Sequence, residues 1–344
     1  MIKIKNRIIN FNSEPFIIPE IGINHNGKLE TAFKIVDSAK RAGAEVIKHQ
    51  THEIDDEMSE EAKKIKPGNS RKNIFSIIKE SSLSEEKEYK LFKYVESKKM
   101  IYLSTPFSRK AVDRLMKFGV SAFKIGSGEM SNYPLLDYVS KFKKPLIVST
   151  GLHNLKQVKK TFSFLKKRKI NFAFLHTTNI YPTNDKLLRL NSILQLKKIF
   201  PDTVIGLSDH TGDILSSIVG LSLGAKIVEK HFVHNKKIRG PDISSSIDEN
   251  QLKDLIINSK RISKQIKGNK NHLLKEEEVT RRFAFASVVS FKDIKKGEKF
   301  SKKNLWVMRP GTGAFSSEKL EYLYGRYAKK NIKKNKQISK SDIK

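Results

Sequence analysis

The sequence predicts an α/β fold of the (β/α)8 barrel type, followed by a smaller C-terminal domain. Eight short apolar runs are rich in Val, Ile and Phe and bounded by turn residues, which is typical of strands buried on both faces. Segments with helical periodicity separate these runs, as expected for parallel strands covered by outer helices. The length of 344 residues fits a barrel of about 250 residues plus a further small domain. The predicted strands are Phe16–Gly22, Val46–Thr51, Tyr102–Phe107, Ala122–Glu129, Leu146–Gly151, Phe172–Asn179, Val204–His210 and Ile227–Phe232.

The predicted helices lie between these strands and after the last one. Each has apolar residues at a spacing of three or four, which marks one buried face. The second strand is followed by a long insertion, Glu53–Glu80, whose Pro67, Gly68 and Asn69 indicate an active-site loop with a short helix. The predicted helices are Leu29–Ala42, Glu86–Lys99, Ala111–Phe118, Asn154–Lys169, Leu187–Phe200, Ile214–Leu223 and Gln251–Lys267.

The composition changes near residue 268, which predicts a domain boundary. The charged stretch GNKNHLLKEEEVTRR suits a linker, so we expect a barrel at 1–267, a linker at 268–284 and a C-terminal domain at 285–344. This last segment contains a weak repeat, since Lys292–Leu305 resembles Lys330–Ile343. Each copy predicts a short strand, a turn and a one-turn helix, and the pair predicts a pseudo-symmetric domain.

The formal net charge of +32 invites a nucleic-acid hypothesis. Of the 68 basic residues only 13 are Arg, and the lysines lie along most of the chain. Base recognition and bidentate phosphate capture favour Arg, and binding faces cluster their charge. We therefore interpret the lysine excess as a composition bias and expect no nucleic-acid partner, although a positive field would help to attract an anionic substrate.

Cysteine is absent, which excludes disulfides, thiolate metal ligands and a cysteine nucleophile. No apolar stretch approaches the roughly 20 residues of a membrane helix. The N-terminal segment MIKIKNRIIN has no apolar core typical of an export signal. We expect a cytoplasmic protein without a membrane partner.

Two histidines close neighbouring strands, His210 the seventh and His231 the eighth. Because the C-terminal ends of parallel strands meet at one rim, both imidazoles should lie close together. Two neutral imidazoles suit a divalent ion such as Mn²⁺ or Zn²⁺, and two protein ligands leave positions open for water and substrate. The alternative is that either histidine is an ordinary polar residue at a strand end.

Two lysines lie inside otherwise apolar runs, Lys48 in the second strand and Lys124 in the fourth. Lysine is rarely buried without a partner, so two of them at a barrel mouth indicate an anion. The Gly126–Gly128 turn, with Ser127 at its centre, allows close approach of phosphate oxygens. A Schiff base is the competing use of such a lysine, and it needs a depressed pKa, which nearby carboxylates do not favour. Further donors at other strand ends are Gln50, Thr105, Asn179 and Ser208.

Carboxylates complete the predicted rim, with Glu20, Glu129 and Glu229 at strand ends and Asp242 in a following loop. They suit acid–base chemistry, hydroxyl recognition or support of a metal ligand, while a structural ion pair with Lys48 is the alternative for Glu20. A metal, an anion cradle and these carboxylates together fit addition of a phosphorylated carboxylic acid to a polyhydroxy aldehyde.

The strand-end motifs resemble those of the sialic acid synthase family. The matching pieces are PEIGINHNG, IKHQT, STPF, FKIGSGE, STG, TTNIYPT, GLSDHT, EKHF, GPD and WVMRPG, in the order of the family. The resemblance implies a (β/α)8 barrel with a C-terminal antifreeze-like (SAF, β-clip) domain. It also implies condensation of phosphoenolpyruvate with an open-chain N-acetylated hexose, with release of phosphate.

Site roles follow from the same resemblance. It implies that Mn²⁺, or another divalent ion such as Mg²⁺ or Co²⁺, polarises the sugar aldehyde, and that water is positioned by Glu129. It implies a domain-swapped homodimer in which Arg309 of one subunit recognises the N-acetyl group in the barrel of the other. The implied contacts are Lys48 and Thr105 for the carboxylate, Lys124, Ser127, Asn179 and Ser208 for the phosphate, His210 and His231 for the metal, and Glu20, Tyr181 and Asp242 for the sugar. Gln50, a donor at a strand end, is a further substrate-binding candidate.

The stretches IKHQTH, DEMS and FAFASVV look like the bacterial N-acetylneuraminate synthases, so N-acetylmannosamine is the expected sugar. The legionaminic and pseudaminic acid branches look more distant but remain alternatives. One departure is FAFAS, where many members carry an Arg-Ser pair. The rivals are a barrel that condenses phosphorylated sugars, a basic nucleic-acid-binding protein, and an ice- or partner-binding tail.

Overall fold

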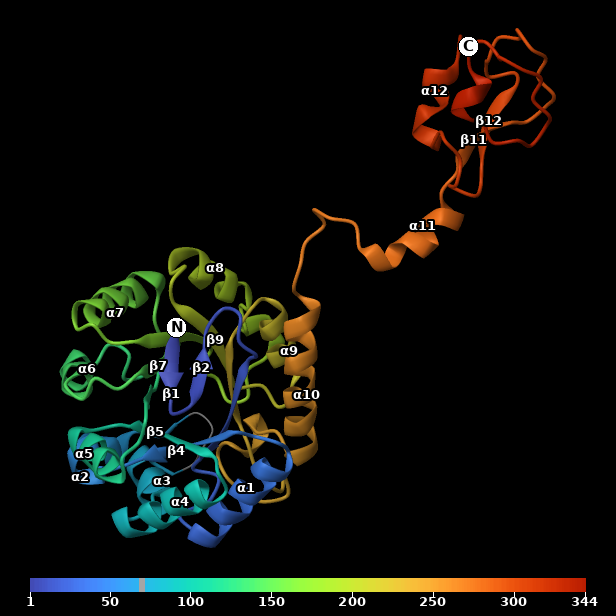
Figure 1. The fold of residues 1–344 in the computed structure, drawn as a ribbon. Coiled ribbons are helices and arrows are strands. Elements are labelled where there is room, and N and C mark those ends of the chain that lie inside the picture. The colour runs from blue at the N-terminus through green and yellow to red at the C-terminus, as the bar shows by residue number, and fades with distance from the viewer. Residues whose placement is uncertain (68–71) are drawn as a thin grey trace. The chain divides into compact units, whose positions relative to one another are not determined.

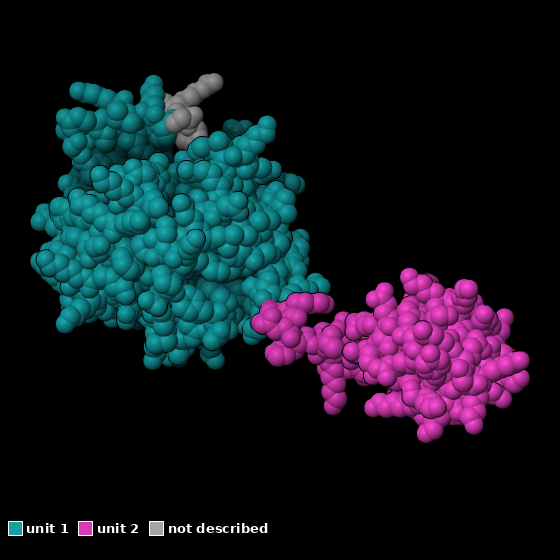
Figure 2. All heavy atoms as spheres, turned by 90° about the horizontal axis from the view of Figure 1, so that it is seen from above, with its two compact units in different colours: residues 1–267 teal, residues 268–344 magenta. Residues whose placement is uncertain are grey.

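The computed structural model describes residues 1–67 and 72–344, which form two compact units, Met1–Lys267 and Gly268–Lys344 (Figures 1 and 2). Gly68 and Asn69 of the predicted insertion lie outside the described residues. Among the described residues, no helix combines the length and apolar character needed to cross a bilayer.

The first unit contains the predicted (β/α)8 barrel. Its strands pair in parallel in the order β5-β4-β3-β10-β9-β8-β7-β6, and β5 packs beside β6 where the two ends of this order meet. Every strand residue except Gln50 is buried, which explains why these segments read as continuous apolar runs. The strands are β3 Phe16–Gly22, β4 Val46–Thr51, β5 Ile101–Pro106, β6 Phe123–Ile125, β7 Leu146–Ser149, β8 Phe172–Thr177, β9 Val204–Asp209 and β10 Ile227–His231.

Helices surround this barrel (Figure 1). One of them, α6, is missing from the prediction, although Asn132 caps it and Pro134 stands in its first turn. The insertion after β4 holds more helix than the single short one expected, with α2 Ile54–Glu57, a 3₁₀ turn and α3 Ile74–Ser81. The remaining helices are α1 Leu29–Arg41, α4 Glu85–Ser97, α5 Arg109–Phe118, α6 Tyr133–Ser140, α7 Leu155–Lys167, α8 Asn191–Ile199, α9 Leu215–Ser222 and α10 Glu249–Gln265.

An N-terminal hairpin, β1 Ile2–Ile4 and β2 Arg7–Ile9, closes the end of the barrel where the strands begin. Ile2, Ile4 and Ile9 are buried against residues at the strand starts, such as Val46 and Ile227. This hairpin was not predicted from the sequence. With this end filled by apolar side chains, the opposite rim is left for polar ones.

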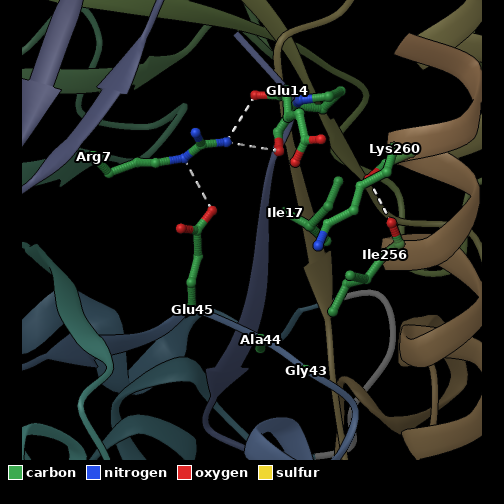
Figure 3. A pocket seen from close by; sticks show the side chains of 10 residues that line it. Arg7, Glu14, Ile17, Gly43, Ala44, Glu45, Ile256 and Lys260 are labelled. Carbon is green, nitrogen blue, oxygen red and sulfur yellow. Dashed lines mark hydrogen bonds and ion pairs between the residues drawn. The ribbon is translucent and has the colours of Figure 1, made fainter. Parts of the chain in front are cut away.

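A small pocket next to the hairpin contains charged residues that serve the fold (Figure 3). The Arg7 guanidinium lies between Glu45, 3.0 Å from its carboxylate, and the Glu14 carbonyl, to which it donates a 2.8 Å hydrogen bond. These contacts join the hairpin to the first two barrel strands. Polar groups at the N-terminal end of the barrel strands generally contribute to the stability of the fold rather than to catalysis.

The second unit has the predicted pseudo-symmetry. It begins with α11 Glu278–Ala284 and contains β11 Ser287–Ser290, β12 Leu305–Met308 and α12 Leu320–Leu323. Ile294 and Ile332, equivalent positions of the two repeats, donate 2.8 Å backbone hydrogen bonds to each other. Such reciprocal pairing of equivalent residues is expected where a local twofold axis passes between them.

The same repeats build the core of the unit. Phe300 and its equivalent Ile338 are both buried in a cluster separate from those of the barrel. The second copy ends in the predicted one-turn helix, Lys340–Asp342, whereas the first has a turn at 302–304. The one-turn helix was therefore predicted correctly for one of the two copies.

Candidate active site

The C-terminal strand ends assemble one polar cavity of about 160 Å³. All predicted site residues except Glu129, Asp242 and Arg309 line it. The lining residues are Glu20, Lys48, Gln50, Thr105, Phe107, Lys124, Gly126, Ser127, Gly128, Ser149, Thr177, Asn179, Tyr181, Ser208, His210, Glu229 and His231.

The two lysines lie at the bottom of this cavity on either side of Glu229. The Lys48 ammonium forms a close ion pair with Glu20 and lies 3.7 Å from Glu229, and the Lys124 ammonium lies 3.8 Å from the same Glu229 oxygen. Burial lowers the pKa of Lys48, but the charges of Glu20 and Glu229 outweigh burial and raise it. The ion pair between Glu20 and Lys48, considered as a structural alternative, is thus present, and it also holds both groups at the cavity.

Lys124 is held differently. Its ammonium donates hydrogen bonds to the Ser149 hydroxyl at 2.7 Å and to the Ile125 carbonyl at 3.0 Å. Burial lowers its pKa to about 8, and Glu229 only partly opposes this. Nearby carboxylates therefore keep the pKa of Lys48 high, as expected, but they do not prevent the pKa of Lys124 from falling. Ser149, at the end of the fifth strand, was not among the predicted site residues, yet it lines the cavity and fixes Lys124.

The two predicted metal ligands lie side by side. The ring centroids of His210 and His231 are 5.5 Å apart, and Tyr181 stacks on His210 at 4.2 Å. His210 donates from Nδ1 to the Thr178 carbonyl at 2.8 Å, so Nε2 carries the lone pair, and the Ser208 hydroxyl lies 3.5 Å from it. Burial and the neighbouring His231 lower the pKa of His210 to about 3, which keeps the ring neutral as metal binding requires.

Four buried polar atoms of the site lack a hydrogen-bond partner among the described residues. They are Ser127 Oγ, Asn179 Oδ1, Glu229 Oε2 and His231 Nδ1. A buried polar group without a partner is costly, so such a concentration indicates a place for ligand, metal or ordered water. Within residues 1–67 and 72–344, no group of three or more His, Asp or Glu residues is placed to hold a metal, so the two histidines would act as a pair.

Three predicted site residues lie outside the cavity lining. Asp242 is adjacent to it, 3.7 Å from His231 Nδ1, and burial raises its pKa. Glu129 lies in a neighbouring hollow of about 380 Å³, where it accepts a 2.5 Å hydrogen bond from Asn132, and burial raises its pKa too. Arg309 is exposed in the second unit.

A buried polar network beside β4 was not predicted from the sequence. Glu88 accepts hydrogen bonds from Tyr102 at 2.9 Å and from Arg114 at 2.9 Å, and His49 lies 3.3 Å from the same carboxylate. Burial raises the pKa of Glu88, but hydrogen bonds, first of all from His49, lower it to about 2. The polar residues of VIKHQT alternate between two faces, and this alternation could have indicated the network. Lys48 and Gln50 face the cavity, whereas His49 and Thr51 contact Glu88 on the other face.

Comparison with known proteins agrees with this architecture. Residues 35–271 match the NeuB family and residues 285–344 match the SAF domain. An uncharacterized protein of Methanocaldococcus jannaschii is 36% identical, covering 91% of this chain and 90% of its own length. The N,N'-diacetyllegionaminic acid synthase of Campylobacter jejuni is 34% identical, over 94% and 98% of the two chains.

Among solved structures, the N-acetylneuraminic acid synthetase of Leptospira borgpetersenii superposes with a TM-score of 0.75 at 27% identity, covering 81% of this chain and 94% of that one. These identities do not favour the neuraminate branch, so the expectation that the legionaminic branch is more distant gains no support. The resemblance drawn from the strand-end motifs is confirmed at the level of the family. The chain belongs to the NeuB family of sialic, legionaminic and pseudaminic acid synthases and carries a C-terminal SAF domain.

Proposed function

We propose that this protein condenses phosphoenolpyruvate with open-chain N-acetylmannosamine and water to give N-acetylneuraminate and phosphate. The observation that carries the proposal is the pair of buried lysines facing unpartnered polar atoms in one cavity. A small trianionic substrate fits such a site because fixed cations and donors replace its hydration.

The substrate would span the two lysines. Lys48 and Thr105 would hold its carboxylate, whereas its phosphate would be held by the remaining donors. These donors come from three different strand ends, those of β6, β8 and β9, so the phosphate position is defined by the barrel rather than by one loop. They are Lys124, Ser127, Asn179 and Ser208.

The reaction forms a carbon–carbon bond and a bond from carbon 2 to the water oxygen, and it breaks the bond from carbon 2 to the phosphate oxygen. Carbon 3 of phosphoenolpyruvate attacks the sugar aldehyde carbon, and the aldehyde oxygen takes up a proton. Carbon 2 becomes positive, water adds to it and loses a proton, and the tetrahedral intermediate then releases phosphate by C–O cleavage. Glu20, Tyr181 and Asp242 would bind sugar hydroxyls, and Glu129 would position the water. Glu129 contacts Asn132 in the structure, so this role requires its side chain to turn toward the cavity.

His210 and His231 would hold a divalent cation, Mn²⁺ in our proposal, with Mg²⁺ or Co²⁺ as alternatives. The residues fit such an ion, since His231 Nδ1 is buried without a hydrogen-bond partner among the described residues, and the lone pair of His210 Nε2 makes a long contact of 3.5 Å with the Ser208 hydroxyl, which an ion could replace. When bound, the ion would supply Lewis-acid polarisation of the aldehyde. Remaining coordination positions would be filled by water and substrate.

Lys124 makes phosphoenolpyruvate binding pH-dependent. Its pKa of about 8 means that it is charged below this pH and neutral above it, so the KM for phosphoenolpyruvate is expected to rise above about pH 8. The measurement is KM from about pH 6 to 10 for wild type and for Lys124→Arg, whose guanidinium stays charged throughout. A wild-type KM that does not rise, or rises equally in Lys124→Arg, contradicts the assignment.

Gly151 makes room for Asn179. A Cβ at this position would lie 1.8 Å from Asn179 Oδ1 and 2.8 Å from Ser127 Oγ, so Gly151→Ala is expected to displace both proposed phosphate ligands. We expect the KM for phosphoenolpyruvate to rise by about tenfold or more, the effect of losing one good hydrogen bond to a charged group. Steady-state kinetics with the sugar saturating would measure it, and an unchanged KM would argue against Asn179 as a ligand.

A product assay identifies which sugar is the substrate. Because a relative with 34% identity makes N,N'-diacetyllegionaminic acid, a hexose carrying two acetamido groups is the second candidate. Pure protein would be incubated with phosphoenolpyruvate, Mn²⁺ and each sugar, and the products would be identified by mass. We expect the larger kcat/KM with N-acetylmannosamine, whereas a preference for the diacetamido sugar would reassign the chain to the legionaminate branch.

We further propose a homodimer that exchanges its C-terminal units, with Arg309 contacting the N-acetyl group. The support is the match of WVMRPG to the family motif. Lys124→Ala and Arg309→Ala proteins should each have little activity, and co-refolding them should restore part of it, because a mixed dimer contains one intact site. Failure of two inactive variants to complement each other would contradict the exchange.

A further inference from the structure

A chain of hydrogen bonds runs from the reaction cavity outward through His52. Gln50 donates from Nε2 to Glu20 at 3.1 Å, and its Oε1 lies 3.2 Å from His52 Nε2. On the other side of the ring, His52 Nδ1 lies 2.8 Å from Glu57 Oε2 at the end of α2. The chain therefore begins at a proposed sugar-binding carboxylate and ends in the insertion after β4.

The acceptors at the two ends fix the direction of every bond. The Glu20 carboxylate can only accept, so the Gln50 amide nitrogen must face it and the amide oxygen must face His52. The Glu57 carboxylate also accepts. Both ring nitrogens of His52 thus face oxygen acceptors, and the arrangement is satisfied when both carry a proton.

The surroundings hold the ring in this position. The side chain of His52 is 3% exposed, and its ring stacks on Phe107 with 4.5 Å between centroids and 8° between planes. Phe107 itself lines the reaction cavity. His25 is a further titratable group that interacts with the ring, and burial and His49 lower its pKa to about 3, so it is neutral and adds no second positive charge.

Gln50 is the polar side chain that this arrangement presents to substrate. With one N–H given to Glu20 and one lone pair given to His52, it has one N–H and one lone pair left, and it lines the cavity while partly exposed. One donor beside one acceptor matches a sugar hydroxyl, which both donates and accepts.

We propose that His52 is a positioning residue for sugar recognition, which holds Gln50 in a single amide orientation by donating from both ring nitrogens, to Gln50 and to Glu57. This inference rests on the proposed function in that the ligand of Gln50 is taken to be the hexosamine. Without the His52 donor, the Gln50 amide can rotate by half a turn. Its oxygen and nitrogen then exchange positions and no longer match the sugar hydroxyl.

The test separates positioning from a merely structural role. His52→Phe keeps a ring to stack on Phe107 but removes both donors, so the KM for the sugar is expected to rise about tenfold, with kcat and the KM for phosphoenolpyruvate within about twofold. His52→Gln keeps one donor and should recover part of the loss. Glu60→Gln, which breaks only an exposed ion pair with Lys63 in the same insertion, is the matched control and should change none of these values.

A drop in thermal stability with unchanged sugar KM in His52→Phe would overturn the proposal, as would equal rises in both KM values. Nitrogen-15 spectra of the histidine rings give a readout independent of turnover, with the His52 signals assigned by their loss in His52→Phe. We expect a proton on Nε2, the nitrogen that faces the Gln50 amide oxygen, and a ring that carries its proton on Nδ1 alone would overturn the proposal. If wild type condenses no hexosamine, the proposed function fails, and these spectra still decide the state of His52.

Discussion

Replacing Lys124 with Ala is expected to lower kcat/KM for phosphoenolpyruvate by about 10³-fold or more, the upper range for removing one fixed charge-stabilising donor from an active site. The ammonium is buried beside Ser127, Ser149 and Asn179, and no other cation except Lys48 lines the cavity within the described residues. Without it, the phosphate would have to leave water for a site whose nearest charge is Glu229. Steady-state kinetics with saturating sugar would measure the loss.

The fold should tolerate this change. Because burial lowers the pKa of Lys124 from 10.5 to about 8, its charge costs about 3 kcal/mol of folding free energy at neutral pH. Lys124→Met, which keeps most of the side-chain volume, is therefore the matched variant and should unfold at the wild-type temperature or above. A Lys124→Met protein that retains activity would refute the phosphate role, whereas loss of folding in both variants would refute the stability argument.

Replacing His210 with Ala should remove activity and its dependence on added metal together. With one imidazole left, the site would keep His231 alone, and a single histidine binds a divalent ion too weakly to hold it in place. We expect kcat to fall by about 10³-fold, since Lewis-acid polarisation contributes several kcal/mol. The measurements are turnover with Mn²⁺ in excess and after chelation, with bound metal determined on the protein as isolated.

His176→Ala is the control for this variant. His176 is also buried near a strand end, but its Nε2 donates to the Leu188 carbonyl at 2.7 Å and it does not line the reaction cavity. Metal content and metal dependence should survive in His176→Ala. Rates that are unchanged by chelator in wild type would remove the basis for assigning His210 and His231 to a metal.

The strand ends could be predicted because they obey a strong local rule. A polar residue at the end of a buried strand needs a hydrogen-bond partner or an opposite charge, and parallel strands place all such residues at one rim of the barrel. This reasoning correctly brought His210 next to His231 and Lys48 next to Glu20. The repeat in the C-terminal unit was found in the same way, since equivalent residues such as Ile294 and Ile332 pair with each other.

What was missed depends on contacts between distant segments. Ser149 became a site residue only because Lys124, 25 positions earlier, reaches it from the neighbouring strand β6. Glu88 looked like an ordinary charged residue of an amphipathic helix until α4 packed it against Arg114 and Tyr102. Glu129 follows a strand, as predicted, but the turn at Gly128 carries its side chain into the neighbouring hollow.

The most direct measurement uses phosphoenolpyruvate labelled with ¹⁸O in the oxygen that bridges carbon 2 and phosphorus. Pure protein, Mn²⁺ and N-acetylmannosamine would be added, and both products would be analysed by mass. Condensation with C–O cleavage predicts unlabelled N-acetylneuraminate and phosphate that carries the label. Absence of a sugar–pyruvate adduct, or label retained in the adduct with unlabelled phosphate, would contradict the function proposed for this site.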